Sequence, residues 1–163
     1  MPKARKLNSM RLLEAQSIAY ETHHYDPEIR DAEEVAAALG LPADEVFKTL
    51  VVECPSRKKP ILVLLPCDCT LNLRRLAKAL GEKKVALAPH ARAEALTGLK
   101  VGGTSALALI QKGWDVTLDA RAMAVANIVI SAGQRGTQLR LETADLIDLL
   151  GCRIIDVADA KGS

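Results

Sequence analysis

Aromatic side chains are scarce in this sequence of 163 residues, at 2%. The four present are Tyr20, Tyr25, Phe47 and Trp114. A platform of stacked rings, on which many proteins bind single-stranded nucleic acid, is therefore poorly supplied. The core must be built from aliphatic side chains. Because 49% of the residues are hydrophobic, there are enough of these for one domain with a substantial core.

Long hydrophobic runs are also missing. No stretch approaches the roughly 20 consecutive apolar residues of a membrane-spanning helix, and the apolar run Ile61–Leu65 stops at Pro66. The basic residues near the N-terminus are not followed by an apolar segment of signal-peptide length. We therefore expect a cytoplasmic protein that has no membrane partner and whose cysteines are reduced thiols.

Cysteine pairs with metal-binding spacing are lacking. Cys67 and Cys69 would point the same way in an extended segment, but a structural zinc site usually needs four ligands in paired spacings. Cys54 and Cys152 supply no second pair. We expect neither a metal nor another cofactor; a cysteine-based metal or redox protein stays the minor alternative, which stoichiometric zinc would favour.

A large excess of charge of one sign is absent too, since the formal net charge is +2. This excludes a histone-like nucleic-acid binder. The charges are nevertheless unevenly distributed: Arg57–Arg92 holds nine Lys/Arg and two acids, whereas Glu21–Glu34 holds six acids and one Arg. The basic segment is either a solvated face or a surface for a polyanion. Its central cations are Arg74, Arg75, Lys78, Lys83 and Lys84.

Short helical and strand patterns alternate along the chain. Helices are predicted at Ser9–Ala15, from Asp31 to Gly40, from Asn72 to Gly81, from Pro89 to Gly98 and from Thr143 to Gly151. Strands are predicted at Ile18–His24, Phe47–Glu53, Ile61–Pro66, Lys84–Leu87, Asp115–Leu118, Asn127–Ser131, Gln138–Glu142 and Arg153–Val157. This order favours a single mixed α/β (α+β) domain over residues 1–163, with a curved, largely antiparallel mixed sheet flanked by short helices, over a doubly wound parallel sheet. Residues 1–8 and 158–163 are predicted to be loose termini.

Two kinds of feature carry candidate chemistry. Lys48 lies in a strand that is apolar on both faces, where a partly desolvated ammonium binds a phosphate or a polarised carbonyl strongly; alternatively, it extends to solvent. Two glycine-rich turns, Val101–Ala106 and Ser131–Gly136, can bring main-chain amides close to an anion or an oxyanion. Neither turn contains a Gly-x-Ser-x-Gly elbow, so a serine nucleophile is not favoured.

Together these pieces resemble a known family. Gly40–Val51 is similar to the signature of the YbaK-type aminoacyl-tRNA editing domains, which include the Cys-tRNA(Pro) deacylase and the insertion editing domain of bacterial prolyl-tRNA synthetases. The later landmarks follow in the same order: Leu76–Gly81, Lys83–Val85, Gly102–Ser105 and Ser131–Gly136. The resemblance covers Tyr25 to Val157.

The resemblance implies a trans-editing deacylase that hydrolyses mischarged tRNA without a cofactor. The implied substrate is Cys-tRNA(Pro), or another small amino acid on tRNA(Pro), cleaved with the substrate's own assistance. The partners are then the acceptor end of an aminoacylated tRNA and prolyl-tRNA synthetase, and not DNA. Two departures, Ala106 in place of the family's proline and Gln138 where relatives often carry an acid, favour the alternative of a non-catalytic module that binds tRNA ends or nucleotides.

The same resemblance assigns the residues of the site. The expected catalytic residues are Lys48, Gly102, Gly103, Ser131 and Gly133. The expected substrate-binding residues are Tyr25, Phe47, Thr104, Ser105, Ala106, Arg135, Gly136 and Gln138. The five central cations of the basic segment are expected to bind tRNA. The resulting hypothesis requires Lys48 and both glycine turns to border one cavity.

Overall fold

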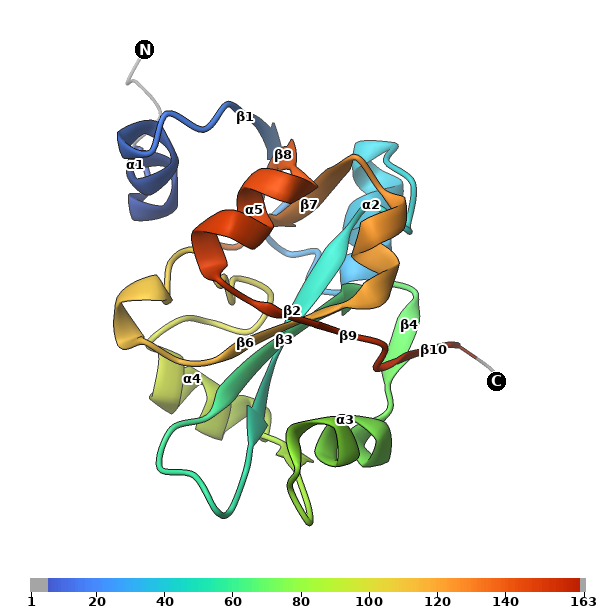
Figure 1. Cartoon of the computed structure of the whole chain (residues 1–163). Coiled ribbons are helices and arrows are strands. Elements are labelled where there is room, and N and C mark those ends of the chain that lie inside the picture. The colour runs from blue at the N-terminus through green and yellow to red at the C-terminus, as the bar shows by residue number, and fades with distance from the viewer. Residues whose placement is uncertain (1–5, 162–163) are drawn as a thin grey trace.

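Five short α-helices and three groups of hydrogen-bonded strands make up the computed structural model, which describes residues 6–161 (Figure 1). The helices are α1 (Asn8–Ala15), α2 (Ala32–Leu39), α3 (Leu73–Leu80), α4 (His90–Thr97) and α5 (Thr143–Leu150), with short 3-10 helices η1 (Ile110–Lys112) and η2 (Ala120–Ala124). The strands are β1 (Tyr20–His24), β2 (Phe47–Glu53), β3 (Ile61–Pro66), β4 (Cys69–Leu71), β5 (Ala86–Leu87), β6 (Val116–Asp119), β7 (Asn127–Ser131), β8 (Thr137–Glu142), β9 (Arg153–Ile155) and β10 (Ala158–Ala160). The mixed, largely antiparallel α+β class is confirmed: five strand pairings in this part of the chain are antiparallel and two are parallel.

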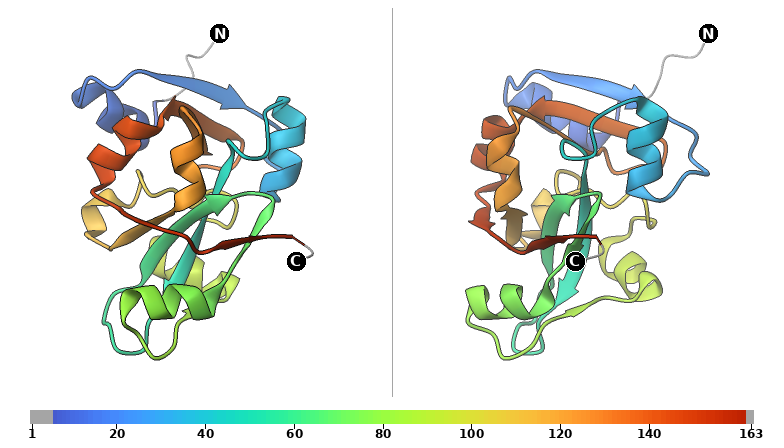
Figure 2. Two further views of the ribbon diagram at one scale, coloured as in Figure 1. Left: turned by 45° about the vertical axis from the view of Figure 1, so that its right-hand side comes forward. Right: turned by 90° about the vertical axis from the view of Figure 1, so that its right-hand side faces the viewer.

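The central sheet has the strand order β5-β2-β3-β6-β9. The predicted hairpin of β2 and β3 forms, and all six residues of β3 are buried. Helices α3 and α4 cover opposite faces of this sheet (Figure 2). Leu76 of α3 packs with Val52 and Val63, whereas Ala93 of α4 belongs to the cluster that contains Val51. Burial on both faces explains why β2 and β3 are apolar runs without strict alternation.

The second sheet, of order β1-β8-β7, joins the central one at the start of β2. There Val46 forms an isolated bridge with Val129 of β7. The expectation of one curved sheet is thus refined: the strands divide into five-, three- and two-stranded groups within residues 6–161, and this bridge links the first two. The bridge brings the end of β7 and the turn that follows it close to β2.

Helix ends follow the predicted capping residues. The side chain of Asp31 accepts a hydrogen bond from the Glu34 amide, and Asn72 accepts one from the Arg75 amide. Gly40 and Gly81 end α2 and α3 in the left-handed conformation, with φ of 67° and 72°, which glycine adopts without steric cost. None of the helices in the described part of the chain is both long enough and apolar enough to span a membrane.

The prediction of a loose C-terminal segment is wrong for residues 158–160. These residues form β10, which pairs with β4, because the fully buried carboxylate of Asp119 accepts hydrogen bonds from the amides of Val157 and Ala158. The predicted strands Lys84–Leu87 and Arg153–Val157 are shorter than expected, as the bounds of β5 and β9 show. At the other end, Asn8 already belongs to α1; residues 1–5 and 162–163 lie outside the described residues.

Candidate active site

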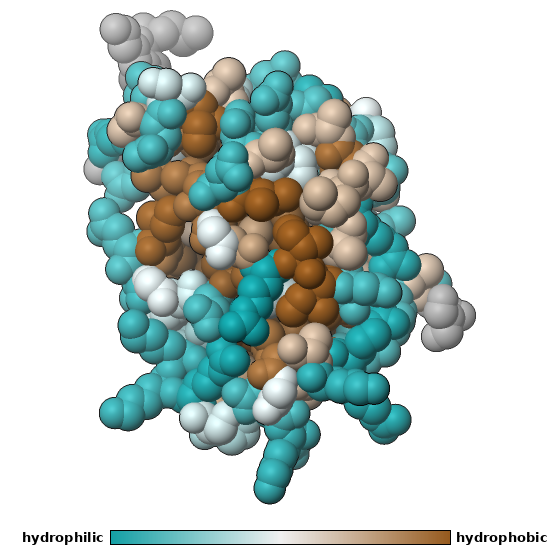
Figure 3. All heavy atoms as spheres, in the orientation of Figure 1, coloured by the Kyte–Doolittle hydropathy of each residue, from teal (hydrophilic) through white to brown (hydrophobic). Residues whose placement is uncertain are grey.

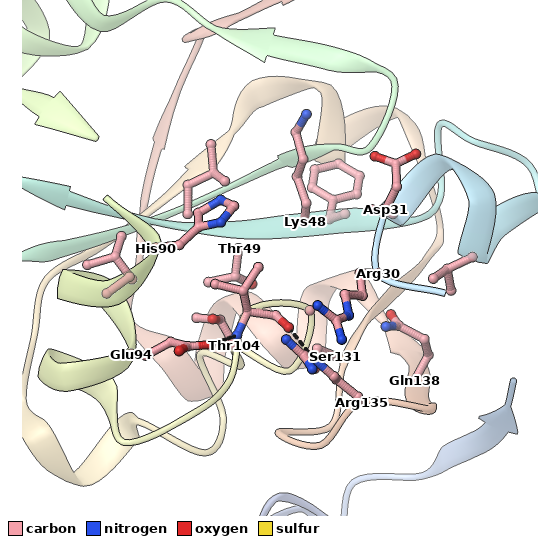
Figure 4. A pocket seen from close by; sticks show the side chains of 18 of the residues that line it. Arg30, Asp31, Lys48, Thr49, His90, Glu94, Thr104, Ser131, Arg135 and Gln138 are labelled. Atoms are coloured by element: carbon pink, nitrogen blue, oxygen red, sulfur yellow. Dashed lines mark hydrogen bonds between the residues drawn. The ribbon is translucent and has the colours of Figure 1, made fainter. Parts of the chain in front are cut away.

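A cavity of about 610 Å³ lies along β2, with α2 at one end and α4 at the other (Figure 4). Five consecutive residues of β2, Phe47 to Val51, line it. Successive side chains of a strand point to opposite faces of a sheet, so a cavity that meets five in a row must run along the strand's edge. The cavity therefore lies beside the edge of β2 that faces away from β3.

Both predicted glycine turns border this cavity together with Lys48. Eight of the thirteen expected catalytic and substrate-binding residues line it: Tyr25, Phe47, Lys48, Gly102, Thr104, Ser131, Arg135 and Gln138. The other five do not line it: Gly103, Ser105, Ala106, Gly133 and Gly136. Lys48 and residues of both glycine turns thus border one cavity, as the sequence hypothesis required. Of the predicted glycines, however, only Gly102 lines the cavity.

Lys48 and Thr49 project to opposite sides of β2 (Figure 4). The Lys48 ammonium lies 3.4 Å from the carbonyl oxygen of Cys67 and is part-buried. The thiol of Cys67 is not an alternative nucleophile. Burial raises the pKa of this thiol to about 11, and the Cys67 Sγ donates a hydrogen bond to the Ala43 carbonyl at 3.3 Å. Lys48 thus places one positive charge at one side of the cavity, beside a thiol that stays protonated at neutral pH.

The two glycine turns pack directly against each other. A Cβ on Gly103 would lie 3.1 Å from the backbone nitrogen of Arg135, and one on Gly133 would lie 3.0 Å from the Cβ of Ala108. The Arg135 guanidinium donates from Nε to the Val101 carbonyl at 2.5 Å. At Gly103 the neighbouring main chain leaves little room for a side chain, and at Gly133 the Ala108 side chain does so.

Much of the hydrogen-bonding capacity of these turns is used internally. The Gly103 amide donates to the Lys100 carbonyl at 2.8 Å, and the Gly133 amide donates to the Ser131 hydroxyl at 3.2 Å. The amides of Gly102 and Thr104, two residues on the cavity wall, have no partner within residues 6–161. The amide of Arg135, in the second turn and also on the cavity wall, is likewise unbonded in this part of the chain, so each turn keeps at least one amide that could stabilise an oxyanion.

Several lining residues were not among the predicted site residues. Arg30, Asp31, Thr49, His90 and Glu94 come to the cavity from three separate elements and their flanking loops. Glu94 accepts a hydrogen bond from the Val101 amide at 2.9 Å and so holds the first glycine turn. Asp31 carried only a helix-cap pattern, and nothing along the chain links the others, because tertiary packing alone brings them together.

Two polar atoms in the cavity wall are buried without a partner among the described residues. They are the hydroxyl oxygen of Thr49 and the amide oxygen of Gln138. Gln138 is only 6% exposed, and its Nε2 lies 3.5 Å from the Tyr25 hydroxyl. A buried unpaired polar atom costs free energy, which a ligand with complementary groups removes.

The cavity holds no nucleophilic triad. Ser105 is fully buried and its hydroxyl accepts from the Ala108 amide, while Ser131 accepts from the Gly133 amide. No hydrogen bond joins a histidine to either serine in residues 6–161. The same part of the chain contains no cluster of three or more His, Cys, Asp or Glu side chains arranged for a metal. The geometry offers cations, amides and hydroxyls rather than an attacking side chain.

A second, basic hollow of about 450 Å³ lies at the C-terminal end of α3. The cations that line it are Arg74, Lys78, Lys83 and Lys84. We call it the basic groove. On the face shown in Figure 3, hydrophilic side chains project from the end of the molecule where Figure 1 places α3 and the β2–β3 turn, whereas hydrophobic ones gather nearer the middle.

Arg75 does not line the basic groove. Its guanidinium lies 2.8 Å from Asp159 and 3.5 Å from Asp156, and it donates to the Ala158 carbonyl at 3.0 Å. Hydrogen bonds from Asn72 and Arg75 hold the pKa of Asp159 below its usual value. Arg75 therefore fastens β10 and does not contribute its charge to the basic groove.

Comparison with known proteins identifies the fold and the family. Residues 26–149 match the model of the aminoacyl-tRNA editing domain. Among solved structures, "hypothetical protein APE2540" superposes with a TM-score of 0.83 at 24% identity over 91% of this chain and 97% of that one. "A putative trans-editing enzyme for prolyl tRNA synthetase" gives 0.77 at 19% identity over 96% and 100%. At these identities the structures support the fold.

The sequence relatives are closer. The "Putative Cys-tRNA(Pro)/Cys-tRNA(Cys) deacylase EbsC" of Enterococcus faecalis is 31% identical over 154 residues, 93% of each chain. A proline–tRNA ligase of Pelotomaculum thermopropionicum is 32% identical over 113 residues, which are 69% of this chain but only 19% of the ligase. The match to the family model and the full-length relative lead to one conclusion: this chain belongs to the aminoacyl-tRNA editing domain family.

Proposed function

We propose that this aminoacyl-tRNA deacylase hydrolyses mischarged tRNA(Pro) that carries cysteine or another small amino acid. The observation that carries the proposal is the single cavity in which Lys48 meets both glycine turns without any side-chain nucleophile. Its volume of about 610 Å³ is within the usual range for sites that hold small ligands and is suited to an amino acid esterified to a terminal adenosine.

The chemistry needs little from the protein, because an aminoacyl ester is already reactive. The Lys48 ammonium binds the phosphate or the ester region of the terminal adenosine. The free amides of Gly102 and Thr104 stabilise the negative charge that develops on the carbonyl oxygen. Holding the ester in this position lowers the entropic part of the barrier.

The attacking group is then supplied by the substrate. For a cysteinyl ester, the substrate's thiol attacks its own carbonyl: the C–S bond forms, the C–O bond to the ribose breaks, and the thiol proton passes to the leaving ribose oxygen. For an amino acid without a thiol, a water activated by the ribose hydroxyl takes the thiol's place, and its hydroxide and proton end on the acid and the ribose. Both routes agree with the triad-free cavity.

The basic groove is the proposed contact for the tRNA acceptor end. From Lys83 and Lys84 the chain runs directly into β5, and Leu87 of β5 and His90 of α4 already line the cavity. A phosphate backbone neutralised by the groove would thus lead toward the cavity. We further propose that prolyl-tRNA synthetase is the cytoplasmic partner that supplies selectivity for one tRNA.

The two departures from the family pattern, Ala106 and Gln138, lie at different places relative to the cavity. Ala106 is buried and does not line the cavity, so it acts on the pocket only through packing. Gln138 does line the cavity, and its amide oxygen is buried without a partner among the described residues. Gln138 is therefore the position that we expect to set which small amino acid is accepted.

A deacylation panel tests the proposal. The purified protein is mixed with Cys-tRNA(Pro), Ala-tRNA(Pro) and correctly charged Pro-tRNA(Pro), and release of each amino acid is followed over time. We expect Cys or Ala to be released and proline to be retained. Binding of all three tRNAs without release would instead identify a non-catalytic module that keeps the editing fold.

A further inference from the structure

The edge of β2 that borders the cavity has a gap in its hydrogen-bond ladder. At one end of the gap the Glu45 carbonyl accepts from the Val129 amide at 2.8 Å, and at the other the Val51 carbonyl accepts from the Ala88 amide at 2.9 Å. In an antiparallel pair, main-chain groups alternate between the two edges of a strand. The N–H and C=O groups of Phe47 and Thr49, between these two anchors, therefore face the same edge.

The bridge between Val46 and Val129 uses the Phe47 N–H at one end of this gap, and no strand pairing within residues 6–161 reaches Thr49 on the same edge. Pairing with β5 is confined to Val52 and Glu53, and on the opposite edge the Val46 carbonyl accepts from the Cys67 amide, which places even-numbered residues toward β3. The cavity occupies the space beside Thr49, whose hydroxyl is also buried without a partner. Unpaired main-chain groups in a buried place are costly, so this stretch of strand is suited to a ligand.

A group that fills such a gap must carry a donor and an acceptor with the spacing of one amino-acid residue. In antiparallel sheets two opposed residues exchange both of their main-chain hydrogen bonds. An aminoacyl ester meets this requirement because its α-amino group donates and its ester carbonyl accepts. A phosphate offers only acceptors and cannot satisfy the Thr49 carbonyl; an adenine has a donor beside an acceptor, so the matched probe described below, which keeps the adenosine and lacks the α-amino group, separates the two occupants.

We propose that the aminoacyl group of the substrate binds in the gap as a single added strand residue opposite Thr49. Its α-amino group donates to the Thr49 carbonyl, and its ester carbonyl accepts from the Thr49 amide. This inference rests on the proposed function and extends it: the Thr49 amide becomes an oxyanion donor besides those of Gly102 and Thr104. Recognition through main chain alone also leaves the side-chain preference to other groups in the cavity.

The register has a consequence for the substrate side chain. Opposed residues in a sheet place their side chains on the same face, with Cβ atoms about 5 Å apart. Thr49 projects to the side of β2 on which Ser131 and Arg135 lie, away from Lys48 (Figure 4). The side chain of an L-amino acid therefore lies beside the unpaired Thr49 hydroxyl, whereas the lysine side of the strand is left for the adenosine.

The first test measures binding to the unmodified protein and does not depend on turnover. The probe is adenosine with cysteine joined to its 3′ position through an amide, which resists hydrolysis; the matched probe lacks only the α-amino group. We expect the first probe to bind 10- to 100-fold more tightly, a difference of about 1.4–2.7 kcal/mol, because the second probe cannot make the hydrogen bond to the Thr49 carbonyl. We also expect it to move the Thr49 amide proton resonance downfield. Equal affinities, or an unmoved Thr49 resonance on saturation, would overturn the proposal.

The second test removes the Thr49 N–H itself. Cys54 permits ligation of a synthetic segment 1–53 to the remaining chain, so Thr49 can be replaced by its α-hydroxy analogue, which turns the amide into a backbone ester. The matched control is the same change at the exposed Asp44, whose N–H has no partner within the described residues. We expect 10- to 100-fold weaker binding of the probe only for the Thr49 ester; equal affinity for both proteins contradicts the inference.

The two proposals fail in different ways. If the unmodified protein binds the probe as expected but releases no amino acid from any mischarged tRNA, the deacylase proposal fails and the gap still holds an aminoacyl group. If Cys-tRNA(Pro) is cleaved and 3-mercaptopropionyl-tRNA(Pro), which lacks the amine, is cleaved equally fast after correction for spontaneous hydrolysis, the deacylase proposal stands and the inference is refuted.

Discussion

The glycine turns and the exposed edge of β2 border the same cavity, yet they use their main chains differently. In the turns, Gly103 and Gly133 have already given their amides to Lys100 and Ser131, and their missing side chains allow close packing. The edge of β2 contains no glycine, and its groups at Thr49 are unpaired. A glycine-rich segment beside a cavity can thus use some of its amides for its own packing, while an ordinary strand edge also offers main-chain groups to a ligand.

The largest loss of activity is expected when the Lys48 side chain, on the face of β2 opposite that of Thr49, is removed. Replacing Lys48 by alanine removes the ammonium that holds the substrate, and we expect kcat/KM for deacylation to fall at least about 100-fold, or about 2.7 kcal/mol. The Lys112→Ala variant, which changes an exposed lysine that does not line the cavity, is the matched control. Steady-state kinetics with Cys-tRNA(Pro) measure the loss of activity, and urea unfolding measures any loss of stability. Near-full activity of a folded Lys48→Ala protein would refute the role given to Lys48.

Because the glycine turns are tightly packed, replacing one of their glycines should lower the free energy of unfolding. In Gly133→Ala the new Cβ would lie 3.0 Å from Ala108 at a φ of +105°, whereas in Gly98→Ala it would meet open space at a φ of +73°. We expect the first change to cost about 2–4 kcal/mol of unfolding free energy through strain and overpacking, and the second about 1 kcal/mol. Denaturant unfolding measures the free energy of unfolding of both variants. An equal decrease in the two would contradict the close packing around Gly133.

The sequence predicted the fold well because its signals are local. The helix caps at Asp31 and Asn72, the glycines after α2 and α3, and the hairpin of β2 and β3 each depend on a few neighbouring residues. The ordered C-terminal strand was missed because it depends on distant residues: the buried carboxylate of Asp119, nearly 40 positions earlier, and Arg75.

The site was predictable only in part, for a related reason. The motifs located Lys48 and both glycine turns, and the structure brings these together. They could not show which amides are already bonded, nor the gap beside Thr49, since both depend on the pairing of distant strands. Glu94 likewise carried no signal, because its role is to hold Val101 across a loop.

A moderate effect is expected at Ser131. Its hydroxyl accepts a hydrogen bond from Gly133 and lies in the cavity wall, but no base is positioned to activate it. We therefore expect Ser131→Ala to lower kcat/KM less than 10-fold, because a structural hydrogen bond contributes about 1 kcal/mol. A loss of 1,000-fold or more, measured with Cys-tRNA(Pro), would identify Ser131 as a nucleophile and end the substrate-assisted scheme.

The smallest effect, on tRNA affinity, is expected from changes in the basic groove. These changes test whether cations without an ion-pair partner form the binding surface there. Lys83 and Lys84 line the groove, whereas Arg75 is bonded to Asp159. Changing both lysines to glutamine should weaken tRNA binding a few-fold at low salt and reduce the slope of log K against log salt by up to about 2, since each phosphate contact contributes roughly one unit.

The matched variant, Arg75→Gln, separates charge that binds tRNA from charge that holds the fold. It should leave the salt slope unchanged and instead lower the unfolding free energy at neutral pH. The lowered pKa of Asp159 means that its ion pair stabilises the fold above the unfolded value of 3.8 and that this contribution is lost as the pH falls through the folded value. The difference in stability between Arg75→Gln and the unmodified protein should therefore become smaller in acid, where only the hydrogen bond from Arg75 to the Ala158 carbonyl remains. A reduced salt slope in Arg75→Gln would mean that this arginine leaves Asp159 to bind phosphate, and that the groove extends along α3 further than its lining residues indicate.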